Sequence, residues 1–434
     1  MIAFTRWGLL FLLVAGTFLV GQEPSKPEPN PAIKKDENNK KDDVPPPKTK
    51  EDLTGKGDPM PPGETKVGPG RGIKPPAQVV GPDGKPVTGS TGLTGMMGSN
   101  YQPPTEVGGK LLRDWVIDLR SADPSLREQA IRAIASFGPN AREAIPQLVE
   151  RMADRDSSPR MRAVLAIKYM DYYDKDIPKV VDGLAKRVSE DPQAAIRYEA
   201  LMALGRFNYQ EGGRTALPAV LKVADDQGNW EVRRSAYSIL PKLGADETGV
   251  DARVYKALIN GVKDTAARAR HEALIGLALL GKPNDAVLAT QMEKALISVL
   301  NSRDVPSEIF ARVALIGYNS ANTKIQMPLI IKHVRDTDFA HRMIAIRAVS
   351  MLGPPAHESV PDLVIYLNDK NPELIMSVCM ALTSMGPDAQ RAADPLRQFL
   401  SKKEIPDDLR SAASFALDAV TRRRFNVTNP NPPR

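Results

Sequence analysis

Small residues return along the chain at a fixed spacing behind a long polar residue. In the stretch Leu126–Ala133, Arg127 is followed by Ala130 three places later and by Ala133 six places later. Offsets of three and six fall near one face of a helix with 3.6 residues per turn, so the pattern predicts a helix with a stripe of small residues. Alanine in such a stripe lets a neighbouring helix approach closely.

The pattern recurs with steps of 34 to 38 residues, which predicts a stacked array of nine repeats. Seven of the nine positions that lie three places after a marker residue are alanine, and the other two are Leu165 and Cys379. We therefore expect an all-α superhelix of helical hairpins. The marker residues are Arg127, Arg162, Arg197, Arg233, Arg270, Glu308, Arg342, Met376 and Arg410.

Each repeat is predicted to contain two helices. A capping oxygen accepts an unpaired N–H of the first turn, and proline at the first helical position removes a donor that has no partner there. Such pairs open the first helix at Asp123-Pro124, Ser158-Pro159, Asp191-Pro192 and Asn371-Pro372. A proline in an apolar run opens the second helix at Pro146, Pro178, Pro218, Pro328, Pro361 and Pro395. Glycine before proline marks the break between the two helices at Gly138, Gly353 and Gly386.

These repeats resemble short HEAT-type repeats of the kind found in bacterial HEAT-like proteins and in phycobilin lyases. The resemblance covers about residues 110–424 and rests on the Arg-x-x-Ala-x-x-Ala helix, the Asp before it and the proline of the second helix. The tetratricopeptide array has a similar period, but its Trp, Gly and Tyr positions do not recur here, so the HEAT type is favoured.

The HEAT resemblance implies a ladder of Asp–Arg bonds between neighbouring repeats. Glu308 and Met376 interrupt the series of arginines, so less regular stacking is expected at the sixth and eighth repeats. The residues that match the ladder are Asp123 with Arg127, Asp191 with Arg197, Asp264 with Arg270, and Asp336 with Arg342.

The composition divides the 434 residues into four segments. Residues 1–21 combine Arg6 with an apolar stretch, which is typical of an export signal peptide or a signal anchor, and both the cleaved and the retained form stay open. Residues 22–109 hold 17 of the 38 prolines and 14 of the 31 glycines, so this linker is predicted to be disordered. Residues 110–424 are the predicted solenoid, and residues 425–434 a disordered tail.

Two stretches depart from the repeat pattern. Leu111–Leu119 is apolar on one side and is predicted to be an unpaired helix that covers the exposed end of the first repeat. In the second repeat Lys168 stands where alanine is expected, and Tyr169, Tyr172 and Tyr173 cluster behind it. Tyrosine is favoured in binding surfaces, but such a cluster more often packs an irregular turn, and both interpretations stay open.

The net charge of +7 does not indicate a nucleic-acid-binding surface. Residues 1–110 contain 14 basic and 12 acidic side chains, which leaves 45 and 40 for the rest of the chain. Four of the remaining basic side chains are the terminal arginines, so the array is close to neutral and lacks the basic excess that phosphate binding favours. Those four are Arg422, Arg423, Arg424 and Arg434.

The single cysteine is predicted to be structural. Cys379 occupies a small-residue core position, where a thiol behaves as a small buried hydrophobe. One cysteine excludes an intrachain disulfide and a metal site of the multi-cysteine kind.

The histidines give no complete metal site. Deoxyhypusine hydroxylase resembles this array and places His-Glu pairs on the first helices of several repeats to hold two irons. Here His271-Glu272 lies in the matching frame, whereas His357-Glu358 falls in a loop, and one pair cannot supply a two-iron centre. His333 and His341 stand near no recurring carboxylate or cysteine spacing. We therefore assign no catalytic, metal or cofactor-binding residue and expect no cofactor.

The sequence favours a non-catalytic protein-interaction scaffold, exported to the periplasm or cell envelope and anchored there if residues 1–21 are retained. The expected partner is a protein or peptide on the concave surface, and the chain itself is expected to be a monomer. One alternative is an enzyme of hydroxylase or bilin-lyase type, and a second is a nucleic-acid-binding protein, since HEAT-like DNA glycosylases exist. No binding residue follows from the sequence, because a fold does not fix a function.

Overall fold

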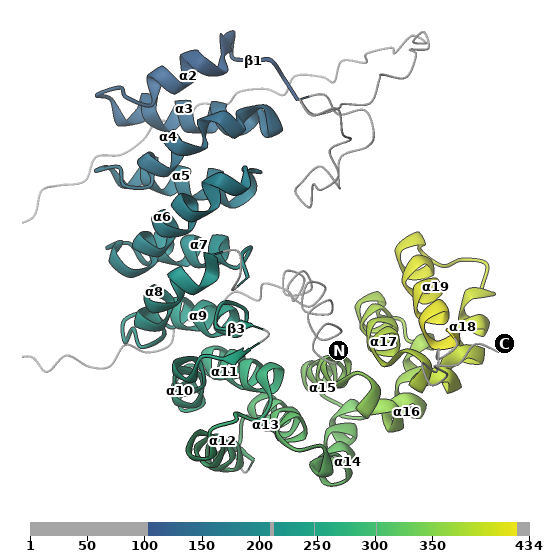
Figure 1. Ribbon diagram of the computed structural model, residues 1–434. Coiled ribbons are helices and arrows are strands. Elements are labelled where there is room, and N and C mark those ends of the chain that lie inside the picture. The colour runs from purple at the N-terminus through teal and green to yellow at the C-terminus, as the bar shows by residue number, and fades with distance from the viewer. Residues whose placement is uncertain (1–102, 209–211, 247, 301, 423–434) are drawn as a thin grey trace, which may run out of the picture. The chain divides into compact units, whose positions relative to one another are not determined.

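The computed structural model describes residues 103–208, 212–246, 248–300 and 302–422. Within these ranges the chain is an all-α superhelix of stacked helical hairpins, which confirms the predicted fold class (Figure 1). The predicted signal segment, most of the predicted linker and the predicted tail lie outside the described residues, so the segment boundaries stay predictions.

The helices alternate between two layers. The first helices of the repeats are α3 (Pro124–Ser136), α5 (Ser157–Tyr169), α7 (Ala194–Leu204), α9 (Trp230–Leu243), α11 (Ala267–Leu280), α13 (Val305–Tyr318), α15 (Phe339–Leu352), α17 (Pro372–Met385) and α19 (Asp407–Thr421). The second helices are α4 (Ile145–Arg151), α6 (Ile177–Glu190), α8 (Arg214–Ala224), α10 (Ala252–Gly261), α12 (Ala286–Val299), α14 (Thr323–Val334), α16 (Val360–Val364) and α18 (Ala393–Leu400). Short 3-10 turns adjoin them at η3 (Gly138–Ala144), η4 (Asp174–Asp176), η6 (Ser320–Asn322), η7 (Pro354–Ser359), η8 (Ile365–Asn368) and η9 (Gly386–Ala392).

Successive first helices pack directly on one another, and most successive second helices pack less closely. The small residues explain the difference, since alanines such as Ala200, Ala236 and Ala273 are fully buried between neighbouring first helices. Closer spacing on one side curves a stack toward that side, so the first helices lie on the inner side of the superhelix (Figure 1). We call the solvent-facing side of the first-helix layer the inner face.

The end of the array is covered as predicted. α2 (Leu112–Asp118) packs on α3 and buries Trp115, whose indole N–H donates to the carbonyl of Val107 at 2.8 Å. A short hairpin, β1 (Glu106–Val107) with β2 (Lys110–Leu111), precedes this helix and was not expected from the sequence. A second hairpin, β3 (Ala245–Asp246) with β4 (Gly249–Val250), links α9 to α10.

The predicted repeat frame is correct in seven repeats and wrong in two. In the seven, the marker stands four residues after the N-cap, and the alanine three places later is fully buried. The N-cap of α5 is Asp156, so its ladder position is Arg160 rather than Arg162. The small residues of α5 are accordingly Ala163 and Ala166, which are 0% and 6% exposed.

In the eighth repeat the frame is wrong by one residue. The N-cap of α17 is Asn371, so the ladder position is Ile375 and not Met376. The buried stripe then runs through Val378 and Ala381, both 0% exposed. Cys379 stays in the core one position beside this stripe.

Two predicted N-caps are confirmed and two are wrong. Asp123 and Asn371 each accept an N–H of the first turn of their helix, at 2.8 and 2.9 Å. Ser158 instead lies inside α5, and Asp191 stands two residues before Gln193, the N-cap of α7. Among the second-helix prolines, those of α8 and α14 lie inside the helix rather than at its start.

The Asp–Arg ladder is present, but each arginine bonds the aspartate of the following repeat. Arg127 donates from Nε and Nη2 to Asp154, with both bonds 2.8 Å long. Its Nη1 donates to the carbonyl oxygens of Ser121 and Ala122 in its own loop, at 2.9 and 3.0 Å. The guanidinium therefore ties its own loop to the next repeat. The other rungs are Arg160 to Asp191, Arg197 to Asp226, Arg233 to Asp264, and Arg270 to Asp304.

The predicted ladder pairs within a repeat are therefore wrong. Asp123 caps its own helix, and the side chain of Asp191 bonds Arg160 of the preceding repeat. Arg197 reaches only the backbone carbonyl of Asp191, at 3.0 Å. Loop carbonyls take one edge of each guanidinium, so only the edge that faces the next repeat is left for a carboxylate.

The ladder stops at the sixth repeat, where the hydrophobic core also divides. Glu308 of α13 accepts from Arg312 of the same helix at 2.6 Å instead of reaching the next repeat. Phe310 and Leu315 belong to the core of the preceding repeats, whereas Val313 belongs to that of the following ones. The division of the core is the irregularity found at the sixth repeat, although α13 still packs closely on α11. The one expected at the eighth is wrong, because α17 packs closely on α15 and α19.

No helix within the described ranges is long and apolar enough to span a bilayer. This finding corrects the expected location: placement in the periplasm or cell envelope through an apolar N-terminal anchor is not supported. Residues 1–21 themselves lie outside the described residues.

Candidate functional site

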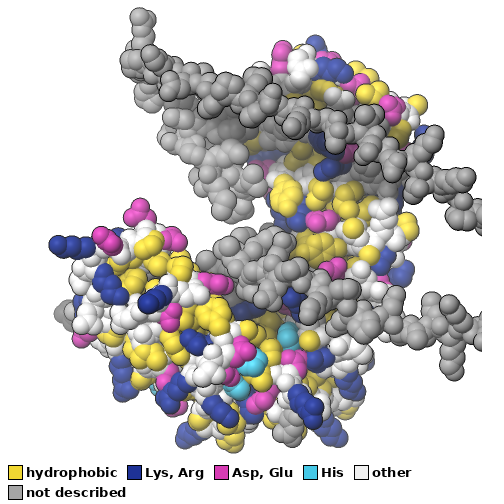
Figure 2. All heavy atoms as spheres, turned by 180° about the vertical axis from the view of Figure 1, so that it is seen from behind, with side chains coloured by type: hydrophobic (Ala, Val, Ile, Leu, Met, Phe, Trp, Pro, Cys, Tyr) yellow, Lys and Arg dark blue, Asp and Glu magenta, His cyan; other side chains and the backbone are white. Residues whose placement is uncertain are grey.

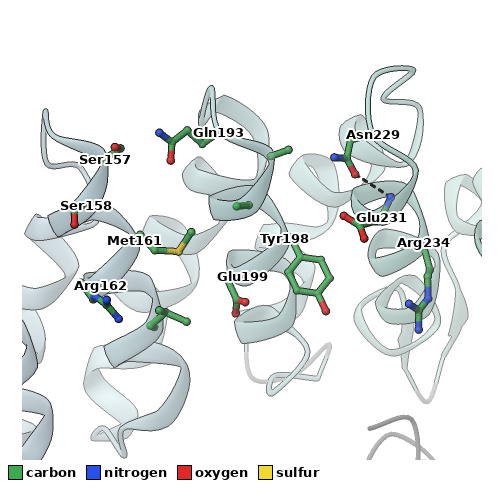
Figure 3. Close-up of a pocket in the computed structure, with 13 residues that line it drawn as sticks. Ser157, Ser158, Met161, Arg162, Gln193, Tyr198, Glu199, Asn229, Glu231 and Arg234 are labelled. Atoms are coloured by element: carbon green, nitrogen blue, oxygen red, sulfur yellow. Dashed lines mark hydrogen bonds between the residues drawn. The ribbon is translucent and has the colours of Figure 1, made fainter. Parts of the chain in front are cut away.

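The inner face is hollowed where α5, α7 and α9 lie next to one another. The groove has a volume of about 830 Å³ and is lined by the N-terminal halves of the three helices (Figure 3). The ladder arginines of these helices point into the stack, so the residues one or two places later point to the inner face. They include Met161 and Arg162 from α5, Tyr198 and Glu199 from α7, and Arg234 from α9.

Charged residues along the groove are paired across repeat boundaries. Arg162 Nε lies 3.0 Å from Glu128 Oε1, which belongs to α3. Glu199 accepts from Lys168 Nζ at 2.8 Å. Each charge is therefore oriented by a side chain of the neighbouring helix. Further along, Arg234 Nε lies 3.6 Å from Glu272 Oε1 of α11.

Two members of these pairs, Glu128 and Lys168, have shifted pKa values. The Ser158 hydroxyl and the Arg162 guanidinium donate to Glu128 and lower its pKa to about 2. Burial lowers the pKa of Lys168, but the interactions with Glu199 and Tyr169 together outweigh burial, and the net pKa is raised. Glu128 and Lys168 therefore stay charged around neutral pH.

The floor of the groove is apolar. Met161, Leu165 and Tyr198 are all partly buried and lie between the charged residues. At the rim, the Asn229 side chain caps α9 by accepting from the backbone N–H of Glu231 at 2.9 Å, the bond drawn in Figure 3. Apolar contact area flanked by oriented donors and acceptors is common in binding surfaces.

The His271-Glu272 pair does not form a metal site. His271 Nε2 lies 3.1 Å from a carboxylate oxygen of Asp304, whereas Glu272 pairs with Arg234 on the other side. Across the ranges that the structure describes, no three His, Cys, Asp or Glu side chains converge in a way that would hold a metal ion. The described residues therefore do not fit the two-iron centre that the hydroxylase resemblance implies.

One tyrosine of the cluster, Tyr172, packs the segment after α5 against the segment after α7. Tyr172 stacks on Phe207 with ring centroids 5.8 Å apart, and the Arg206 guanidinium lies over Tyr172 at 5.0 Å. Arg206 also donates to the carbonyl oxygen of Met170 at 2.9 Å, just past the end of α5. Tyr169 and Tyr173 remain on the surface.

Cys379 is expected to be unreactive in the folded chain. Its thiol is 1% exposed, and burial raises its pKa to about 12. Because the thiolate is the nucleophile, a disulfide reagent such as Ellman's reagent should react at pH 8 at least about a hundred-fold more slowly than with the chain unfolded in guanidinium chloride. Equal rates in the two conditions would contradict the structural role.

The sequence did not identify the groove. Because Arg162 was predicted to be a ladder residue, its side chain was expected to point into the stack and not to the inner face, where it lies. The available signal was the recurrence of long side chains one and two places after four of the five ladder arginines, as in Tyr198 and Glu199 after Arg197. In α5 this pattern can be recognised only when the positions of the helix are counted from its N-cap.

Comparisons with known proteins identify the repeat. Residues 181–278 and 327–418 match HEAT repeats. The solved complex of CpcE and CpcF of phycocyanin lyase from Nostoc sp. PCC7120 is 18% identical, with a TM-score of 0.37, and the match covers 74% of this chain and 99% of that chain. Kap121p bound to Pho4p is 13% identical, with a TM-score of 0.37, and the match covers 71% of this chain and 38% of that chain. The comparison with curated proteins gives no match.

Proposed function

We propose that this chain, a HEAT-repeat solenoid, is a non-catalytic scaffold that binds a protein or peptide on its inner face, across α5, α7 and α9. The observation that carries the proposal is the groove, in which residues of three successive helices offer apolar area and charges that are already oriented. Groups held in place before binding lose little conformational entropy when the partner arrives.

The groove favours an extended segment of the partner. Neighbouring helix axes lie about 8 to 10 Å apart, so three helices span about 20 Å, which an extended strand covers in about six residues. Met161, Leu165 and Tyr198 would contact apolar side chains of such a segment. Arg162 and Glu199 would bond its backbone or its charged side chains.

The two alternatives lack a supporting observation of this kind. An enzyme of hydroxylase or bilin-lyase type needs converging ligands or reactive groups, whereas His271 and Glu272 pair with side chains on opposite sides. Nucleic-acid binding needs a basic surface, whereas Arg162 and Arg234 are each paired with a glutamate.

Groove substitutions should weaken binding of a selected peptide. Peptides are selected from a random display library on the full chain, and their Kd is measured by fluorescence anisotropy. Tyr198→Ser combined with Arg234→Ala removes one aromatic and one charged contact and should raise the Kd at least about ten-fold, or about 1.4 kcal/mol. Circular dichroism verifies that the variant keeps its helical content.

The matched control carries the same kinds of change on second helices. Val287 of α12 is 66% exposed and the side chain of Arg253 on α10 is 58% exposed, so Val287→Ser combined with Arg253→Ala should leave the Kd unchanged. A library that yields no binder, or an equal loss of affinity in both double variants, would refute binding in the groove.

A further inference from the structure

Asp336 occupies the acceptor position of a ladder rung whose arginine is missing. Asp154 stands two residues before the N-cap of α5 and accepts the N–H of Asp156 at 3.0 Å. Asp336 likewise stands two residues before the N-cap of α15 and accepts the N–H of Asp338 at 3.0 Å. The donor that would match Arg127 is Glu308, which is itself an acid.

Two histidines take the place of the missing guanidinium. His333 Nδ1, from the end of α14, and His341 Nδ1, from the start of α15, each lie 3.4 Å from Asp336 Oδ2. One of them belongs to the sixth repeat and the other to the seventh, so the contact ties together two repeats whose helices α14 and α15 share one hydrophobic core. Histidine (cyan) and acidic (magenta) side chains are seen close together on the molecular surface (Figure 2).

We propose that the boundary between the sixth and seventh repeats is a pH-sensitive joint, in which protonation of His333 and His341 supplies to Asp336 the positive charge that arginine supplies at the other rungs. Acid pH tightens the contact between α14 and α15, and neutral pH loosens it. The C-terminal repeats are then held less firmly to the preceding ones.

The other charged groups at this joint are already engaged. Glu308 of α13 is paired with Arg312, and Arg335 of the α14–α15 loop is paired with Asp362 of α16. Arg342 of α15 donates to the backbone carbonyl of Asp336 at 3.1 Å and does not reach the carboxylate. The two imidazoles are therefore the groups beside the carboxylate of Asp336 that can gain or lose a positive charge as the pH changes.

A third histidine lies on the last complete rung. His271 Nε2 is 3.1 Å from Asp304, which also binds Arg270. Burial lowers the pKa of His271, although Asp304 opposes the shift, so this imidazole gains its proton at a more acid pH than an exposed one. The fourth histidine, His357, is exposed beside the carbonyl of Pro354 and serves as a control.

Hydrogen exchange of the full chain tests the joint. Protection of the α14 and α15 amides, corrected for the intrinsic exchange rate, is compared at about pH 5.5 and about pH 7.5, on either side of the ordinary histidine pKa of about 6.5. A histidine that gains an anionic partner stabilises the contact below that pKa, and the stabilisation is lost as the pH rises. Protection should be about two- to five-fold higher at acid pH, the size of one partly exposed ion pair.

The variants separate the joint from a general effect of pH. His333→Gln combined with His341→Gln should abolish the pH response in α14 and α15, whereas His357→Gln should leave it intact. Asp336→Asn keeps an oxygen for the N–H of Asp338 but removes the charge, and it should abolish the response as well. A wild-type chain without the response, or a response that survives in the histidine double variant or in Asp336→Asn, would overturn the proposal.

Discussion

Replacing Arg127 with alanine is expected to lower the free energy of unfolding by about 3 to 5 kcal/mol, because it leaves one partner of a buried ion pair without the other. The side chains of Arg127 and Asp154 are 4% and 1% exposed. After the substitution Asp154 stays buried, with Arg151 at 3.2 Å as its remaining cation. That contact places the expected loss at the lower end of the range, about 3 kcal/mol.

Urea titration followed by circular dichroism measures this loss, and an exposed ion pair provides the control. Arg397 and Asp394 are 58% and 92% exposed, so Arg397→Ala should cost at most about 1 kcal/mol. Similar losses for the two variants would show that burial of the rung contributes nothing.

The cost of Arg127→Ala should also depend on pH. Burial raises the pKa of Asp154, but the hydrogen bonds from Arg127 and the backbone N–H of Asp156, with the charges of Arg127 and Arg151, together outweigh burial, and the net pKa is lowered. A carboxylate with a lowered pKa stabilises the fold above its unfolded pKa of about 3.9 and loses that effect as the pH falls. The difference between wild type and variant should therefore shrink in acid.

Replacing Gly261 with valine is expected to cost about 2 to 3 kcal/mol through overpacking. A Cβ atom at this position would lie 2.8 Å from Cζ of Tyr237 and 2.7 Å from Cβ of Ala273. Tyr237 cannot swing aside without losing the hydrogen bond from its hydroxyl to the carbonyl of Ala224, 3.0 Å long. The higher helix propensity of valine offsets only about 0.3 kcal/mol.

A glycine in an open loop provides the comparison. At Gly228 the nearest atom to an added Cβ is a carboxylate oxygen of Asp226 at 3.2 Å, on a partly buried side chain that also bonds Arg197. Gly228→Val should therefore cost less than about 1 kcal/mol. Repeat arrays can unfold in parts, so hydrogen exchange at α9 to α11 is measured beside global unfolding. Equal losses at the two glycines would refute close packing of α10 against α9 and α11.

The alanine stripe sufficed to predict the fold, because alanine three places after a polar marker is what lets first helices stack. In α5, however, the stripe did not show which residue is the marker and therefore which residues face the core. Arg160 and Arg162 are both candidates for the marker, and counting by one period from Arg127 selects Arg162. A shift of two residues corresponds to a rotation of about 200° around the helix axis, so choosing Arg162 assigned surface residues of α5 to the core and core residues to the surface. The N-cap Asp156 defines the correct register.

The groove and the direction of the ladder could not be predicted from the sequence, for a different reason. Both depend on how one repeat is placed on the next, which no single repeat encodes. The sequence contains Arg127, Asp123 and Asp154, but not the information that loop carbonyls orient Arg127 toward Asp154. The histidines at Asp336 were missed because each belongs to a different repeat.

Every rung of the ladder joins a donor in one repeat to an acceptor in the next. A gene segment that is duplicated or excised over one whole period therefore leaves each arginine facing an aspartate. Removal of residues 160–196, for example, would bring Arg197 into the register of Arg160, one step after Arg127, with Asp226 still ahead of it. Unequal crossing-over can thus lengthen or shorten the first five repeats without rewriting their bonds. At Glu308 this interchangeability ends, and the sixth repeat is not a copy that can replace its neighbours.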